Sequence, residues 1–350
     1  MRLYTSVSDK VFLAALLLSA TTLTLVFYYI AEGFSETMLM EKKSWRIESL
    51  RVEAEKSEFA LMGTSHATSH VMPQDLHYIN LTGGHNLPPA MYYEAKALLK
   101  YATTIKTVYL EADDHLFTNG PAYNIKTTSE NDTVQNTMYD TWQPYFDDEG
   151  KSIFGTNTKK TALYEFLSLQ PDIKPILLKR IVRRIFQQPT QKSSANSQTN
   201  SISACTTIPT IQQPDTSKET YWSRLQGKDR ELELIRRISG FSLDKPSPIS
   251  PLMTEYYEKT IQLFLDHGIA VVLVRFPMAP DFQKGVHPEN TKNINAYLDK
   301  LRKKNNLPML DITYLAENGD RFFENEDHVH ADFFPLIGQI IIKDFCENRQ

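Results

Sequence analysis

The sequence predicts an α/β fold: a flavodoxin-like three-layer α/β/α sandwich with a parallel five-stranded sheet, preceded by one N-terminal transmembrane helix. Three observations predict it. Short apolar segments alternate with longer amphipathic ones, the apolar segments are continuous, and 20 residues near the N-terminus carry no charge. Continuous apolar strands interleaved with helices are typical of a parallel sheet that is covered on both faces.

The uncharged stretch runs from Val11 to Ile30. At about 1.5 Å per residue, a helix of this length matches the thickness of a bilayer core. The stretch is longer than the apolar region of about 7–15 residues in a cleaved signal peptide. A signal peptide and a buried soluble helix remain alternatives. We expect a membrane anchor at residues 1–34 and a stalk or surface helix at residues 35–56.

Charge places the chain relative to the membrane. Arg2 and Lys10 precede the apolar stretch and acidic residues follow it first, which favours a cytoplasmic N-terminus. We therefore expect a single-pass protein of the cytoplasmic (inner) membrane whose C-terminal domain is extracytoplasmic.

The net charge of −4 gives no general electrostatic reason to bind nucleic acid. Two cysteines, Cys205 and Cys346, are too few for a disulfide framework and leave the redox compartment open.

The remaining elements follow in order within one α/β domain at residues 57–345. The predicted strands are Phe59–Met62, Tyr78–Leu81, Thr107–Glu111, Ile269–Arg275 and Pro308–Ile312. The predicted helices are Pro89–Tyr101, Leu252–Asp266, Asn290–Lys304 and Phe333–Phe345, and Gly268 is a plausible stop for the second. The alternation breaks at about 120–250, which predicts an insert. Within it, about 187–218 is rich in Ser, Thr, Gln and Pro and is predicted to be a disordered loop.

Three polar residues stand where a catalytic site is expected. Ser65 follows the first predicted strand, and Asp327 and His330 lie in D-x-x-H spacing before the last predicted helix. A nucleophilic serine needs a base, and the base needs a carboxylate that orients it. Because the carboxyl ends of parallel strands meet at one edge of a sheet, these residues are predicted to form a triad.

These segments resemble the SGNH (GDSL-like) hydrolase superfamily over residues 58–120 and 250–345. The similarity is closest to its membrane-associated extracytoplasmic branch, which includes the alginate O-acetylation proteins and the D-alanyl transfer protein of teichoic acids. "GTSHA" at 63–67 is similar to the first sequence block of the family, "YINLTGGHN" at 78–86 to the second, and "DHVH" at 327–330 to the last. The resemblance implies that Ser65 is the nucleophile, that Asp327 and His330 complete the triad, and that backbone N–H groups of Ser65 and of Gly83 or Gly84 bind the oxyanion.

The resemblance also implies an activity: a serine esterase or O-acyltransferase of the cell envelope that acts through an acyl-enzyme. Its substrate would be a small ester or a cell-surface glycan that carries an acetyl or other small acyl group. A membrane-bound acyl-donor protein is an implied partner, and no cofactor or metal is expected. One block departs from the family pattern, because "YLEADDHLF" at 109–117 has no Asn for the side-chain oxyanion donor. His115 or Asn119 are candidate substitutes, and losing such a donor typically costs about 10²–10³ in rate.

Two other hypotheses remain open. The missing Asn and the large insert are also consistent with a catalytically inactive SGNH-like scaffold in a membrane-bound glycan-modification complex. A metal-dependent hydrolase would be centred on His328 and His330, with Asp113, Asp114 and His115 as the next candidate ligands. His66 and His70 are predicted to be loop histidines that bind no metal.

Overall fold

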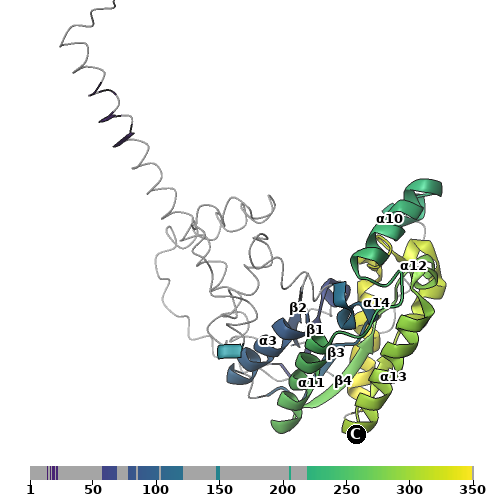
Figure 1. Cartoon of the computed structure of the whole chain (residues 1–350). Coiled ribbons are helices and arrows are strands. Elements are labelled where there is room, and N and C mark those ends of the chain that lie inside the picture. Colours follow the sequence, from purple (N-terminus) through teal and green to yellow (C-terminus); the bar gives the residue numbers. More distant parts are fainter. Residues whose placement is uncertain are drawn as a thin grey trace, which may run out of the picture. The chain divides into compact units, whose positions relative to one another are not determined.

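The structure, a computed structural model, describes residues 57–68, 78–83, 86–101, 104–120, 147–149 and 219–348, together with Cys205 and six residues between positions 14 and 22. The chain divides into two compact units, residues 1–47 with 156–195 and residues 48–155 with 196–350. The second unit contains the sheet and the helices that cover it (Figure 1).

Five strands form one sheet in the order β2-β1-β3-β4-β5. Their bounds are β1 Phe59–Gly63, β2 Tyr78–Thr82, β3 Thr107–Glu111, β4 Ala270–Arg275 and β5 Met309–Asp311. Every pairing is parallel, and this strand order is the one found in doubly wound sheets of the flavodoxin type. All five predicted strands are confirmed, with each end within one residue of its predicted position.

The helices cover both faces of the sheet. One face packs on α3 (Pro88–Tyr101), α11 (Pro251–Asp266) and α13 (Pro288–Asn305). The other packs on α10 (Gly227–Gly240), α12 (Pro280–Gly285) and α14 (Phe334–Glu347). Strand β1 explains the continuous apolar pattern, because Ala60 faces the first cluster and Leu61 the second, and both are fully buried.

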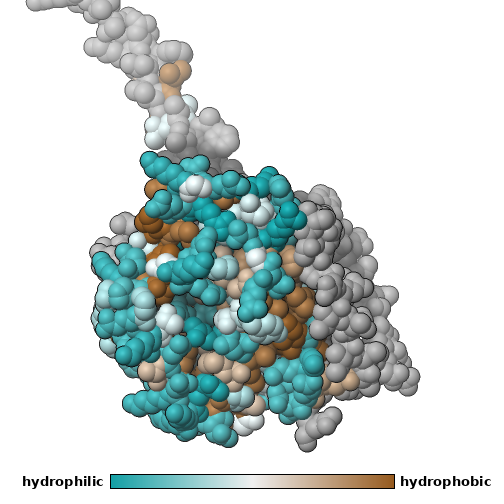
Figure 2. Space-filling view, turned by 90° about the vertical axis from the view of Figure 1, so that its right-hand side faces the viewer, coloured by the Kyte–Doolittle hydropathy of each residue, from teal (hydrophilic) through white to brown (hydrophobic). Residues whose placement is uncertain are grey.

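Short helices complete the described part of the chain. They are α2 Ser65–Thr68, η1 Asp114–Phe117, α9 Tyr221–Arg224, η3 Thr313–Asn318, η4 Asp320–Phe322 and η5 Ala331–Phe333. The predicted stop after α11 is confirmed, since Gly268 has φ 70°, a left-handed conformation that glycine adopts without strain. A disulfide bond joins Cys205 to Cys346 in α14. Seen from the right-hand side of Figure 1, the surface is mostly hydrophilic with smaller hydrophobic areas (Figure 2).

Several predictions concern residues outside those described. They are the stalk at 35–56, the disordered loop at about 187–218 apart from Cys205, and most of the span Val11–Ile30. Six residues of that span are described, and all six are helical. Within the described part of the chain, no helix has the length and apolar character that crossing a membrane requires. The predicted insert contains α9 and α10 in its described part.

Candidate functional site

The site lies where the carboxyl ends of β1 and β3 meet the segment that precedes α14. Ser65 is the first residue of α2, separated from β1 by Thr64, and is half-buried, whereas Thr64 and His66 on either side of it are buried. Gly63 permits this arrangement. A Cβ atom at Gly63 would collide with Oε2 of Glu111 and would lie 2.8 Å from the Cβ of Glu111. Strand β3 can therefore approach the end of β1 only because residue 63 has no side chain.

His66 joins two distant parts of the chain. Its Nδ1 lies 3.2 Å from Oδ2 of Asp113, which follows β3. Its Nε2 lies 3.1 Å from Oδ2 of Asp327, which is 261 residues further along the chain. The segment after the first strand and the segment before the last helix thus meet at one edge, as the parallel topology predicts. The prediction that His66 is a loop histidine is wrong, because the apolar strand before it leads into a buried helical turn; His70 lies outside the described residues.

Asp327 is held by an arginine as well. The guanidinium of Arg237 in α10 donates to both carboxylate oxygens, with Nε 2.6 Å from Oδ2 and Nη2 3.0 Å from Oδ1. Nothing in the sequence indicated this contact, because Arg237 lies in the predicted insert and α10 has several other basic residues. Burial would raise the pKa of Asp327, but hydrogen bonds from His328 and His66 hold it well below its usual range.

His328 is the imidazole that Asp327 orients. Its Nδ1 lies 2.7 Å from Oδ1 of Asp327 and 2.9 Å from Oδ1 of Asn325. Because both neighbours are acceptors, Nδ1 carries the proton and a neutral ring keeps its lone pair on Nε2. The ring centroids of His328 and His66 are 5.2 Å apart, so His328 reaches the residue next to Ser65.

His330 has different contacts. Its Nδ1 accepts a hydrogen bond from the backbone N–H of Asp332 at 3.3 Å, and its Nε2 lies 3.5 Å from Oε2 of Glu324. A neutral His330 therefore carries its proton on Nε2. Among the described residues, the carboxylate of Asp327 contacts His328 and not His330. His328, His66 and Asp327 each offer one ligand atom within 4.8 Å of the others, whereas His330 belongs to no such cluster of three within the described residues.

A second layer of polar side chains lies beneath these residues. Thr64 Oγ1 donates to Glu111 Oε1 at 2.9 Å, and the backbone N–H of Thr64 donates to Oε2. The Nε2 atom of His115 lies 3.3 Å from Thr64 Oγ1 and 3.5 Å from Glu111 Oε1. The His66 and His115 rings are 4.2 Å apart between centroids. Glu111 at the end of an apolar strand is the sequence signal that could have identified this layer.

Burial and these contacts set the protonation of the cluster. Burial alone would lower the pKa of His66, but hydrogen bonds to Asp113 and Asp327 raise it to about 10. Burial and the charge of Asp113 raise the pKa of Glu111 to about 8, against the opposing effects of His66 and Thr64. Burial lowers the pKa of His115 well below its usual range, and the charge of His66 lowers it further. At neutral pH the His66 ring is therefore charged and the His115 ring is neutral.

The predicted oxyanion donors are placed as follows. The backbone N–H of Gly83 donates to the carbonyl of Gly63 at 3.1 Å, so it extends the pairing of β2 with β1. Gly84 lies outside the described residues. The side-chain amide of Asn119 donates to the carbonyl of Pro248 at 2.9 Å.

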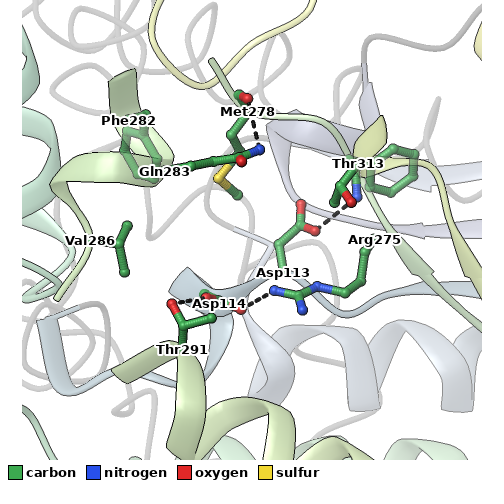
Figure 3. A pocket seen from close by; sticks show the side chains of 10 residues that line it. Asp113, Asp114, Arg275, Met278, Phe282, Gln283, Val286, Thr291 and Thr313 are labelled. Carbon is green, nitrogen blue, oxygen red and sulfur yellow. Dashed lines mark hydrogen bonds and ion pairs between the residues drawn. The ribbon is translucent and has the colours of Figure 1, made fainter. Parts of the chain in front are cut away.

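A pocket of about 300 Å³ opens at the carboxyl ends of β3 and β4, beside Asp113. Figure 3 shows its two sides: Asp114 contacts Arg275 and Thr291, and Phe282 and Val286 stand across the cavity. Asp113 lies in the wall, where its Oδ1 accepts a hydrogen bond from the backbone N–H of Phe276 at 2.9 Å. The pocket therefore has one polar side and one apolar side, and Asp113 separates it from His66.

The described residues thus bring Ser65, His66, Asp327 and His328 to one edge of the sheet and give His330 other contacts. No protein-family profile matches the chain, and no curated protein sequence matches it.

Proposed function

We propose that this protein is a membrane-anchored serine esterase or O-acyltransferase of the SGNH type, with Ser65 as its nucleophile. The observation that carries the proposal is the 3.1 Å contact between His66 and Asp327, because it brings the C-terminal acidic segment to the residue that follows Ser65. A half-buried serine at the carboxyl end of the first strand of a doubly wound sheet is where such enzymes need their nucleophile.

We assign the general base to His328. A triad base needs its Nδ1–H on a carboxylate and a lone pair on Nε2. His328 has this arrangement with Asp327, whereas the hydrogen bond from Asp332 reverses it at His330. His330, the base that the D-x-x-H spacing predicts, remains the alternative that the experiment below distinguishes.

The chemistry follows from these roles. Ser65 Oγ attacks the ester carbonyl while His328 Nε2 takes its proton, and Asp327 stabilises the imidazolium that forms. When the intermediate collapses, the alcohol leaves with that proton and the acyl group stays on Ser65. Water or a sugar hydroxyl then attacks the acyl-enzyme, and His328 takes the proton of the attacking group before returning it to Ser65. Esterase and transferase differ only in this last acceptor.

The pocket beside Asp113 is separate from the proposed nucleophile, since neither Ser65 nor His328 lines it. Its volume of about 300 Å³ is at the lower end of the usual range for ligand pockets, about 300–1,000 Å³. The substrate class of the proposal, an acylated glycan or a small ester, therefore rests on the SGNH resemblance and not on this pocket.

The proposal includes the location of the domain outside the cytoplasm. The uncharged stretch Val11–Ile30 is the proposed single transmembrane helix ahead of the flavodoxin-like sandwich. The disulfide between Cys205 and Cys346 supports this location, since such bonds persist in oxidising compartments and are rare in the cytosol. The bilayer and a membrane-bound acyl-donor protein remain the proposed partners.

Hydrolysis of a small aryl acetate by the full-length protein tests the assignment. Ser65→Ala and His328→Ala should each abolish turnover. His330→Ala should retain at least about a tenth of it, since it would lose only the contacts of His330 with Glu324 and Asp332. Turnover that survives Ser65→Ala refutes the nucleophile. If turnover survives His328→Ala and disappears in His330→Ala, the base is the imidazole that the sequence spacing predicted.

One observation favours a second candidate, the inactive scaffold. The N–H of Gly83 is donated to Gly63 and no Asn follows β3, so two of the family's oxyanion donors are missing from the described site. An inactive scaffold should give no covalent adduct with a fluorophosphonate, whereas the enzyme should be labelled at Ser65.

A further inference from the structure

Four buried side chains next to the proposed triad converge on one point. His66 follows β1, while Glu111, Asp113 and His115 come from the end of β3 and the start of η1. Their exposed fractions are 4%, 0%, 1% and 3%. Each offers one nitrogen or oxygen atom, and all four atoms lie within 4.8 Å of one another. The proposed reaction uses none of the four as nucleophile or base.

The spacing of these atoms fits a metal ion. His66 Nδ1 lies 3.2 Å from Asp113 Oδ2 and 3.8 Å from Glu111 Oε1, and His115 Nε2 lies 3.5 Å from Glu111 Oε1. A tetrahedral ion with bonds of about 2.0–2.1 Å holds its ligand atoms about 3.3–3.4 Å apart. These three distances are within about 0.5 Å of that value, and because the four atoms lie within 4.8 Å of one another, the side chains would draw together to bind the ion.

The surroundings hold the ligand atoms as metal sites require. The other ring nitrogen of His66 lies 3.1 Å from Asp327, and a metal-bound histidine usually donates its second N–H to a carboxylate. The other oxygen of Asp113 accepts from the backbone N–H of Phe276, and that of Glu111 accepts from Thr64. Each of these three side chains is thus oriented by a hydrogen bond at one atom, and Thr64 Oγ1 also donates to the other oxygen of Glu111 at 2.9 Å.

His115 supplies an independent sign of a ligand. Its Nδ1 is buried and has no hydrogen-bond partner. A buried polar atom without a partner costs free energy, so its presence in an otherwise hydrogen-bonded cluster needs a reason. A half-turn about χ2 exchanges Nδ1 with Cδ2 and Nε2 with Cε1, and the imidazole is roughly two-fold about this torsion. The cluster thus includes a buried ring nitrogen that makes no hydrogen bond within the described protein.

The cluster is rich in buried carboxylates. Glu111, Asp113 and Asp327 are buried, and the guanidinium of Arg237 contacts Asp327. Among the described residues, the cationic neighbour of Glu111 and Asp113 is His66. A divalent ion would take over this role, since His66 Nδ1 must lose its proton to bind metal.

We propose that His66, Glu111, Asp113 and His115 bind one Zn²⁺ ion in a buried, four-coordinate site that ties the end of β1 to the end of β3. All four ligands come from the protein and none is exposed, which is the pattern of a closed structural site. The ion would hold His66 in place, and through His66 it would position Asp327.

Metal content of the full-length protein tests the proposal. The purified protein is stripped with a chelator, equilibrated with Zn²⁺, passed through a desalting column and assayed for zinc by mass spectrometry. One zinc per chain is expected. Ser65→Ala and the exposed-site control His267→Ala should bind as the parent does. Glu111→Gln and His115→Gln should each lose affinity at least about 100-fold, measured by competition with a chromogenic chelator.

Two further measurements protect against a variant that simply fails to fold. Asp327→Asn changes none of the four proposed ligands. It should still weaken zinc binding by about 10–100-fold, because it replaces the carboxylate that accepts the His66 N–H by a neutral amide. Cobalt-substituted parent protein should show the intense visible absorption of four-coordinate Co²⁺. A parent protein that retains no zinc, or ligand variants that bind zinc as tightly as the parent, would overturn the site. Zinc binding should not require the Ser65 hydroxyl. Failure of the zinc site and failure of the Ser65 assignment can therefore be told apart.

Discussion

Replacing His66 by alanine should destabilise the protein more than any other single histidine change among the described residues. His66 contacts Asp113 at 3.2 Å and Asp327 at 3.1 Å, and the three side chains are at most 3% exposed. Removing one partner of a buried ion pair costs about 3–5 kcal/mol, because the remaining charge has neither a partner nor water. Since domains are stable by about 5–15 kcal/mol, His66→Ala should remove a large fraction of the total.

Urea unfolding of the full-length protein in detergent, followed by tryptophan fluorescence, measures this loss. Trp222 is fully buried and should report unfolding of the domain. His267→Ala is the matched control, since His267 is exposed at the end of α11 and its change should stay within about 0.5 kcal/mol. A loss below about 1 kcal/mol for His66→Ala would refute the buried ion pairs.

A double-mutant cycle with Asp327→Ala separates the contact from other effects. If His66 and Asp327 interact as the structure shows, the two changes should be coupled by about 0.5–3 kcal/mol. Strictly additive losses would mean that the segment before α14 does not rest on His66.

Three further changes test the packing around the site by the same unfolding assay. Arg237→Met should lower the free energy of unfolding by about 1–3 kcal/mol, because it loses hydrogen bonds to a buried carboxylate. Arg236→Met, on the exposed face of α10, should lower it by under about 0.5 kcal/mol. Equal losses would contradict the contact of Arg237 with Asp327. Gly63→Ala should lower the free energy of unfolding by about 1–3 kcal/mol, because its Cβ would collide with the side chain of Glu111 in β3. A Cβ at Gly240 would meet no atom within 4 Å, so Gly240→Ala should not destabilise the protein. Cys346→Ser should cost about 2–5 kcal/mol, and a reductant should lower the parent protein to the same stability while leaving the variant unchanged.

The sheet could be predicted from the sequence because its strands are buried on both faces. Segments such as Phe59–Gly63 are apolar at every position, and glycine or polar residues end them. Topology then placed the residue after β1 and the segment before α14 at one edge, and the contact of His66 with Asp327 bears this out. Strand boundaries follow from the local sequence, and the meeting of strand ends at one edge follows from the parallel topology. Both can therefore be inferred from one sequence.

The roles of the individual histidines could not be predicted in the same way. His328 and His330 are two residues apart. The turn at Asn325 fixes the ring of His328 beside Asp327, and the backbone N–H of Asp332 holds the ring of His330. Arg237 reaches the site from a helix far along the chain, and its contact depends on how α10 packs. These features arise from tertiary packing, on which residue spacing carries no information.

Fluorophosphonate labelling of the full-length protein, with the modified residue identified by tandem mass spectrometry, shows whether Ser65 is a nucleophile that His328 activates. We expect one adduct, on Ser65, which is lost in His328→Ala and retained in His330→Ala. An unlabelled protein, or an adduct on another serine, would refute the role of Ser65.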